Sequence, residues 1–276
     1  MPTATDLPPI PTRRNVLALR ELADLGTGKG PAYSQDWSPD GLLLATADTN
    51  KIRIWNTSSR QEVGVLVGHA GFTWGLAWSP IMPDGASLLA SGNSDGYVKV
   101  WDAAAQSAIA TLQTGWAFSV DWSPDGQRLV VGTNSAEVQI WDVATQQRLV
   151  SWRCPSYSMV ISIGWSPDGS TIATGELDGS IHLWDAATGQ LRQTIADYTG
   201  ARCDVNGLAW SPDGNTFATA HQDGQVRLWD PTSGELTLTI DAHSGFARGL
   251  AWSPDGSLLA STGEDRRIVL WDPITG

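Results

Sequence analysis

The chain has 276 residues, of which 41% are hydrophobic and 17% charged, a composition typical of a folded globular protein and not of a disordered one. Its formal net charge of -12 argues against a nucleic-acid partner, because binding through phosphates needs a basic surface. No run of about 18 apolar residues occurs, so no membrane span is expected.

The first part of the chain, residues 1–13, is expected to form a Pro-rich tail. It contains no apolar segment of the kind found in signal peptides, and charged residues follow Arg13 and Arg14 where a twin-arginine signal needs an apolar run. Two cysteines, Cys154 and Cys203, are too few for a disulfide scaffold and lack metal-ligand spacing. We therefore expect a cytoplasmic protein with reduced thiols.

A block reading Trp-Ser-Pro-Asp-Gly recurs six times, with three inserted residues in its second copy. A second mark, Trp followed by Asp or Asn, comes roughly twenty residues after each block. The blocks begin at Trp37, Trp78, Trp122, Trp165, Trp210 and Trp252, and the second marks at Trp55, Trp101, Trp141, Trp184, Trp229 and Trp271. The period of 40 to 46 residues predicts a single repeat array over residues 14–276.

Each repeat is predicted to contain four short strands. In the last copy, Gly249 to Trp252 ends one strand, Leu258 to Ser261 forms the next, and Arg267 to Trp271 forms the third. Pro and Gly in the intervening block favour a tight turn. The fourth strand lies between repeats, as in Glu235 to Ile240, where apolar residues alternate. Such sheets can bury their faces only by stacking on one another, and radial closure achieves this.

With these motifs the chain resembles the WD-repeat (WD40) β-propeller family from about Leu19 to its end. The resemblance implies an all-β propeller of four-stranded antiparallel blades, and the six copies predict six blades, fewer than the seven common in this family. It also implies that an N-terminal strand, with Leu19 to Leu25 as the candidate, closes the last blade. A helix over the same segment is the alternative, because Val16, Leu19, Leu22 and Ala23 fall at helical spacing before Gly26.

In this family a His, a Ser or Thr, an Asp and the Trp of the third strand form a hydrogen-bonded set, here named the blade clamp. Two blades match it fully, with His69, Ser91, Asp95 and Trp101 in one and His243, Ser261, Asp265 and Trp271 in the other. The two blades ending at Trp184 and Trp229 keep the hydroxyl and the acid, as Thr174 with Asp178 and Thr219 with Asp223, but lack the His. The first and third blades carry Ala45 and Val131 at the hydroxyl position, so their clamp is expected to be absent.

The remaining polar residues predict no catalytic, metal or cofactor site. The His, Ser and Asp of the clamp superficially resemble a hydrolase triad, but the set occurs twice in register with a fold motif, whereas a catalytic site is usually unique. His182 is expected to be a solvated strand residue, and His221 a turn residue with no second histidine spaced to share a metal. The three residues inserted in the second block, 81–83, are expected to form a mobile loop, with a second contact point as the alternative.

The loops before each first strand are the best candidates for a binding surface, since many WD-repeat proteins bind peptides on this rim of the central channel. The positions six and four residues before the block tryptophans are mostly aromatic or apolar. The predicted partner-binding residues are Tyr33, Phe72, Trp74, Trp116, Phe118, Met159, Asp204, Phe246 and Arg248. An exposed aromatic cluster with Arg248 at its edge is typical of an interaction hot spot, whereas packing between blades is the alternative role.

These features predict a non-catalytic, monomeric scaffold without cofactors that binds a protein or peptide and neither nucleic acid nor membrane. A sensor or regulatory propeller of a larger signalling assembly is the alternative. A propeller hydrolase or sugar-binding propeller would need a site that the sequence does not show.

Overall fold

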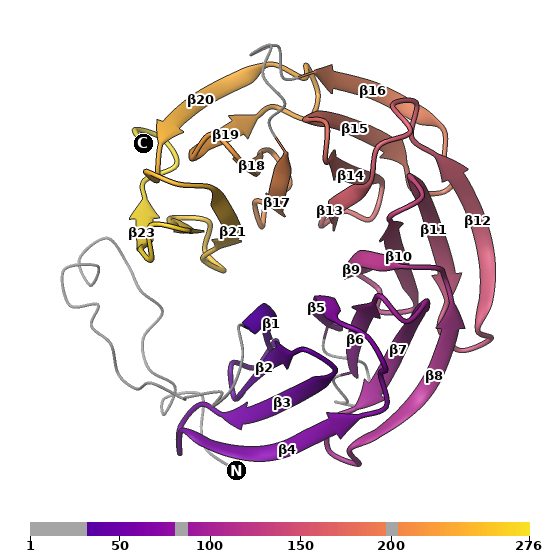
Figure 1. Cartoon of the computed structure of the whole chain (residues 1–276). Coiled ribbons are helices and arrows are strands. Elements are labelled where there is room, and N and C mark those ends of the chain that lie inside the picture. Colours follow the sequence, from indigo (N-terminus) through magenta and orange to yellow (C-terminus); the bar gives the residue numbers. More distant parts are fainter. Residues whose placement is uncertain (1–31, 81–87, 197–203) are drawn as a thin grey trace.

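The computed structural model describes residues 32–80, 88–196 and 204–276. The predicted closing strand, the insertion at 81–83 and Cys203 lie outside these residues. Within them the chain folds into six antiparallel sheets that follow one another around a central axis (Figure 1). No helix is found in the described ranges, so none of their segments meets the requirements of a membrane-spanning helix.

The strands succeed one another from the axis outward in each blade, and the first three blades are each four-stranded. Their strands are β1 (Ala32–Trp37), β2 (Leu43–Asp48), β3 (Lys51–Asn56), β4 (Gln61–Val67); β5 (Thr73–Trp78), β6 (Leu88–Asn93), β7 (Tyr97–Asp102), β8 (Ser107–Gln113); β9 (Ala117–Trp122), β10 (Arg128–Thr133), β11 (Glu137–Asp142) and β12 (Gln147–Arg153).

The fourth and fifth blades are also four-stranded, whereas the described part of the sixth has three strands. Their strands are β13 (Val160–Trp165), β14 (Thr171–Glu176), β15 (Ser180–Asp185), β16 (Leu191–Ala196); β17 (Val205–Trp210), β18 (Phe217–His221), β19 (Gln225–Trp229), β20 (Leu236–Asp241); β21 (Ala247–Trp252), β22 (Leu259–Gly263) and β23 (Ile268–Trp271). The six-bladed, all-β architecture predicted from the repeats is confirmed.

Local turn chemistry explains why the Trp-Ser-Pro-Asp-Gly block ends each inner strand. In the first copy the Ser38 hydroxyl donates to Asp40 at 2.6 Å, and Asp40 accepts the backbone N–H of Leu42 at 3.0 Å. Gly41 has a φ of 70°, a conformation that glycine adopts at no steric cost. The Ser and Asp side chains therefore hold the turn, and the glycine lets the chain reverse into the second strand.

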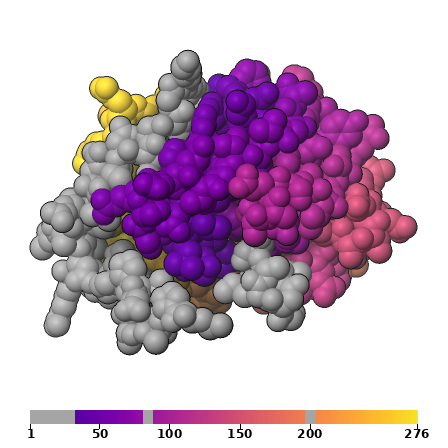
Figure 2. Space-filling view, turned by 90° about the horizontal axis from the view of Figure 1, so that it is seen from below, coloured from indigo at the N-terminus to yellow at the C-terminus, as the bar shows by residue number. Residues whose placement is uncertain are grey.

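The hydrophobic core lies between successive blades. One cluster joins Ile52 and Ile54 of β3 to Leu76 and Trp78 of β5, and all four side chains are at most 8% exposed. Similar clusters fill the following junctions, and Figure 2 shows from the side how the blades adjoin in sequence order, from indigo to pink. Each blade is thus stabilised mainly by its neighbours.

Block tryptophans link adjacent blades through hydrogen bonds as well. At four junctions the indole N–H donates to a backbone carbonyl of the preceding inner strand, at distances of 2.9 to 3.2 Å. The pairs are Trp78 with Asp36, Trp122 with Ala77, Trp210 with Gly164 and Trp252 with Ala209. Trp165 differs, since its indole bonds Gly169 of its own turn. Trp37 of the first blade is 56% exposed, in contrast to the 7% of Trp78.

Candidate functional site

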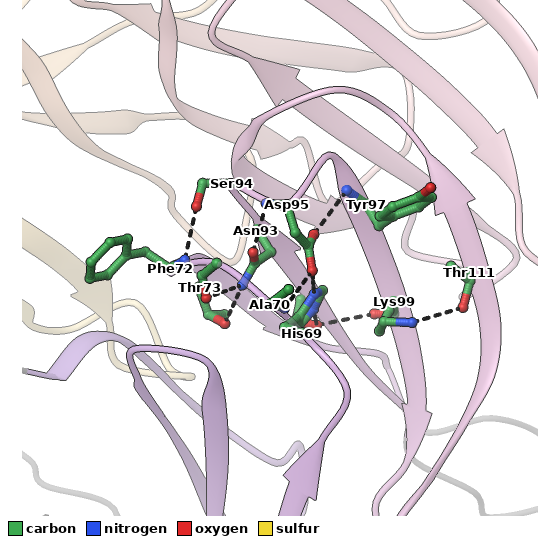
Figure 3. Close-up of polar contacts among 12 residues, drawn as sticks. His69, Ala70, Phe72, Thr73, Asn93, Ser94, Asp95, Tyr97, Lys99 and Thr111 are labelled. Atoms are coloured by element: carbon green, nitrogen blue, oxygen red, sulfur yellow. Dashed lines mark hydrogen bonds and ion pairs between the residues drawn. The ribbon is translucent and has the colours of Figure 1, made fainter.

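A chain of hydrogen bonds joins the four residues expected to clamp the second blade, and Figure 3 shows two of them, His69 and Asp95, beside one another. His69 contacts Asp95 through Nδ1 at 2.8 Å and Ser91 Oγ through Nε2 at 2.7 Å. The Trp101 indole donates to the same Ser91 Oγ at 2.8 Å. The sixth blade repeats this arrangement at 2.8 to 2.9 Å, with His243, Ser261, Asp265 and Trp271.

This environment makes the clamp a structural element of the blade. Burial lowers the pKa of His69, while the hydrogen bond that His69 donates to Asp95 acts in the opposite sense. Ser91 is 0% exposed, so its hydroxyl cannot meet a substrate unless the blade opens. The His, Ser and Asp are therefore the residue types of a hydrolase triad, but a substrate cannot reach the serine hydroxyl.

The first and third blades satisfy the tryptophan indole in other ways. The assignment of Ala45 to the hydroxyl position is wrong, because Trp55 donates to Thr46 at 2.9 Å. The donor and acceptor are nine residues apart here and ten in the second blade, since the turn between β2 and β3 is one residue shorter. In the third blade Val131 leaves the position apolar, and Gln139 Oε1 of β11 accepts the indole bond at 2.9 Å.

The fourth and fifth blades use threonine hydroxyls. The indoles of Trp184 and Trp229 donate to Thr174 and Thr219 at 3.0 and 2.7 Å. The prediction of a turn position for His221 is wrong, because it is the last residue of β18 and is buried, with Nε2 2.8 Å from the Thr219 hydroxyl. The histidine here comes from the same strand as the hydroxyl, whereas His69 of the second blade lies in the loop before β5.

The inner strands surround a central channel of about 1160 Å³. Six of the nine predicted partner-binding residues line it, namely Tyr33, Trp74, Phe118, Met159, Asp204 and Arg248. Phe72 and Trp116 are instead exposed at the surface, by 46% and 52%, and Phe246 is half-buried. The predicted residues therefore divide between the channel wall and its rim.

Aromatic rings of the first three blades form one continuous cluster at the channel. The Tyr33 ring lies 5.6 Å from Phe72 and 5.0 Å from Trp74, measured between ring centroids. Trp74 in turn lies 5.4 Å from Phe118 of the next blade. We refer to Tyr33, Phe72, Trp74 and Phe118 as the rim cluster. The cluster packs between blades, as the alternative role predicts, while Phe72 remains exposed.

Charged and amide side chains face the rim cluster from the fifth and sixth blades. The Arg248 guanidinium lies 5.1 Å from the centre of the Phe246 ring and forms an ion pair with Glu264. It also donates to Asn206 Oδ1 at 3.4 Å. Asp204 lies on the same side of the channel wall. The rim thus combines an aromatic sector with a polar one.

Two carboxyl groups on the channel wall were not identified in the sequence. Asp36 accepts the backbone N–H of Trp78 at 2.6 Å and of Trp37 at 2.9 Å, and Asp121 accepts those of Trp165 and Trp122 at 2.7 and 2.8 Å. Burial is the main cause of a raised pKa in both groups, about 7 for Asp36 and about 6 for Asp121. The backbone N–H bonds act in the opposite direction and lower both pKa values. In the sequence these two groups can be recognised as an Asp immediately before the block tryptophan, where the other blades have Ala or Gly.

A pH-dependent stability follows for Asp36. Because the native state keeps the proton to higher pH than the unfolded chain, with its ordinary pKa of 3.8, the contribution of this group to stability is lost as the pH rises from about 4 through 7. We expect Asp36→Asn to become more stable relative to the wild type between about pH 5 and pH 8. Urea unfolding at each pH measures this difference.

Asp255→Asn is the control for that experiment. The hydrogen bond from Ser253 lowers the pKa of Asp255, so its titration falls below the same pH range. Parallel stability curves for wild type and Asp36→Asn would contradict the assignment.

A second group of polar side chains meets at the fourth blade. The prediction that His182 is solvated is wrong, because it is 2% exposed and its Nδ1 lies 2.6 Å from Glu176 Oε1. Ser156 also bonds Glu176, and Cys154 is buried beside them. Burial, followed by the neighbouring Glu176, raises the pKa of the Cys154 thiol above its usual range. A neutral, buried thiol is not a nucleophile.

The fold, with its internal repeat and indole-to-hydroxyl bonds, defines a β-propeller repeat protein. The family model for the WD domain, G-beta repeat (WD40), matches residues 22–56, 147–185, 191–230 and 234–272, which is more than half of the chain. This protein therefore belongs to the WD40 repeat family. A second model, eukaryotic translation initiation factor eIF2A, matches residues 76–146.

Individual relatives are similar over parts of the chain. Cell division cycle 20.1, cofactor of APC complex, from Arabidopsis thaliana is 32% identical over 139 residues, which cover 48% of this chain and 29% of the relative. Nuclear distribution protein PAC1 from Arthroderma benhamiae is 35% identical over 98 residues, which cover 33% of this chain and 21% of the relative. The matches therefore span less than a third of either relative.

The same fold occurs in a solved structure, the crystal structure of a mitotic checkpoint complex. One of its chains superimposes with a TM-score of 0.75 at 26% identity, over 87% of this chain and 74% of that chain.

Proposed function

We propose that this protein is a non-catalytic scaffold that binds a protein or peptide at the rim of its central channel. The observation that carries this proposal is the rim cluster, where four aromatic rings from three blades adjoin in one cluster. Large aromatic side chains at a partly exposed site are typical of the residues that dominate binding energy. The names of the relatives, an APC cofactor and a checkpoint complex, are those of interacting proteins and support the same role.

The chemistry of the rim indicates what such a partner would present. Phe72 and Trp116, which lie before the first strands of adjacent blades and are exposed by 46% and 52%, would pack against apolar or aromatic groups of the partner. Arg248 and Glu264, each about half-exposed, would bond polar groups on the other side. We further propose that the free protein is a monomeric propeller in the cytoplasm, as its sequence predicts.

Exchanging the exposed rim aromatics tests this function. We expect Phe72→Ala with Trp116→Ala to reduce capture of the native partner at least about tenfold, because each truncated hot-spot residue costs about 1–2 kcal/mol or more. The measurement is affinity purification from the native cell with quantification of each retained protein.

The matched control carries Ile109→Ala and Leu149→Ala, two apolar residues of the outer strands β8 and β12 that are exposed to the same degree. These should leave capture unchanged. A partner retained equally by all variants would rule out docking at this rim.

A further inference from the structure

Cys154, Glu176 and His182 converge from three separate segments at the junction of the third and fourth blades. Cys154 directly follows β12, Glu176 ends β14 and His182 lies within β15. One potential ligand atom from each lies within 4.8 Å of the other two, and the residues are 0 to 2% exposed. In the part of the chain that the structure describes, this is the one group of three such residues.

The blade clamp does not require this group. The Trp184 indole already donates to Thr174, so the usual contact of the blade is made. The corresponding positions of the second blade hold Gly68, Asn93 and Lys99, and those of the sixth hold Ala242, Gly263 and Val269. The sixth blade thus forms the clamp with small and apolar residues where the fourth has three potential ligands.

Burying these groups has an energetic cost that the fold does not explain. A buried carboxylate needs partners, and Glu176 uses its two oxygens for His182 and Ser156. Apolar residues of similar volume are often at least as stabilising as a buried ionic pair. Clusters of buried titratable groups that packing does not require are typical of functional sites.

The donor set matches a particular class of cation. A thiolate sulfur, an imidazole nitrogen and a carboxylate oxygen together suit Zn²⁺, which binds all three in tetrahedral sites at about 2.0–2.3 Å. Donor atoms in such a site are about 3.3–3.8 Å apart, so the present separations, all within 4.8 Å, require only small side-chain movements. Water or the Ser156 hydroxyl is available for the fourth position.

We propose that Cys154, Glu176 and His182 bind one Zn²⁺ ion in the fourth blade, beneath the loop between β12 and β13. The ion would hold this loop against β14 and β15, in a place where the second blade uses the hydrogen bonds of His69. The site is distinct from the rim cluster, so its test does not depend on the proposed docking function.

Titration of the metal-free full chain with Co²⁺ tests the site, since thiolate-bound Co²⁺ gives a charge-transfer band and tetrahedral Co²⁺ gives visible absorption. We expect saturation at one equivalent and displacement by Zn²⁺. Cys154→Ala should abolish the charge-transfer band and weaken Zn²⁺ binding more than about 100-fold. Since Ala242 occupies the matching position of the sixth blade, this variant is expected to fold, and circular dichroism checks that it does.

Two further variants make the result specific. Cys203→Ala removes the other cysteine of the chain and should keep the full band, whereas His182→Gln should weaken Zn²⁺ binding and alter the visible bands while the thiolate remains. Absence of a one-equivalent band in the wild type, or its persistence in folded Cys154→Ala, would overturn the proposal. So would its loss in Cys203→Ala.

Discussion

Trp78→Ala should lower the free energy of unfolding by about 3–5 kcal/mol, the usual cost of truncating a large buried aromatic residue. Its side chain is 7% exposed, packs with Ile52 and Ile54 across the junction between the first two blades, and donates to the Asp36 carbonyl at 3.1 Å. Denaturant unfolding monitored by circular dichroism measures the loss.

Trp37→Ala provides the matched control, because it removes the same side chain from the same block of the preceding repeat. Trp37 is 56% exposed, so we expect a loss of less than about 1 kcal/mol. Equal losses for the two variants would contradict this difference, and would mean that Trp37 is as well packed in solution as its counterparts at the other junctions.

The second large loss of stability is expected for a substitution at Ser91, the central residue of the blade clamp. Ser91→Ala removes the one oxygen that contacts both the Trp101 indole and His69 Nε2. Each buried polar group left without a partner costs about 1–3 kcal/mol, so the variant should lose about 2–4 kcal/mol of stability although it changes little volume. Thermal and urea unfolding both report this loss.

The third blade suggests a second substitution that should restore part of the stability lost in Ser91→Ala. There Gln139 bonds the indole where Val131 offers no hydroxyl, and Lys99 holds the corresponding position in the second blade. Adding Lys99→Gln to Ser91→Ala should restore about 1 kcal/mol, the net worth of one hydrogen bond. Lys99→Gln alone is the control and should change stability by less than about 0.5 kcal/mol. A loss of less than about 0.5 kcal/mol for Ser91→Ala would contradict the central role of Ser91 in the clamp.

The architecture was predictable because it rests on local turn chemistry repeated six times. The Ser38 and Asp40 side chains and the positive φ of Gly41 reverse the chain without help from distant residues. The clamps with His69 and His243 were predictable for a similar reason, since the repeat brings their members to fixed positions.

Other features depend on contacts that a single sequence does not reveal. A turn shorter by one residue moves the acceptor of the first blade from Ala45 to Thr46, because side chains alternate along a strand. Trp37 and Trp78 occupy the same position of the same motif and differ eightfold in exposure. The difference depends on where each blade lies in the propeller and on which residues pack over its tryptophan. Cys154 and Glu176 are 22 residues apart, and only the pairing of β14 with β15 brings His182 to them.

The direction of the indole bonds between blades bears on how the protein is made. In four junctions the donor belongs to the later repeat and the acceptor to the earlier one. A nascent chain emerges from the ribosome with its N-terminal part first. At these four junctions the newly synthesised blade can therefore dock onto a partner that has already left the tunnel, without waiting for residues still to be translated. In these four repeats the position of a single tryptophan thus favours assembly in the order of synthesis.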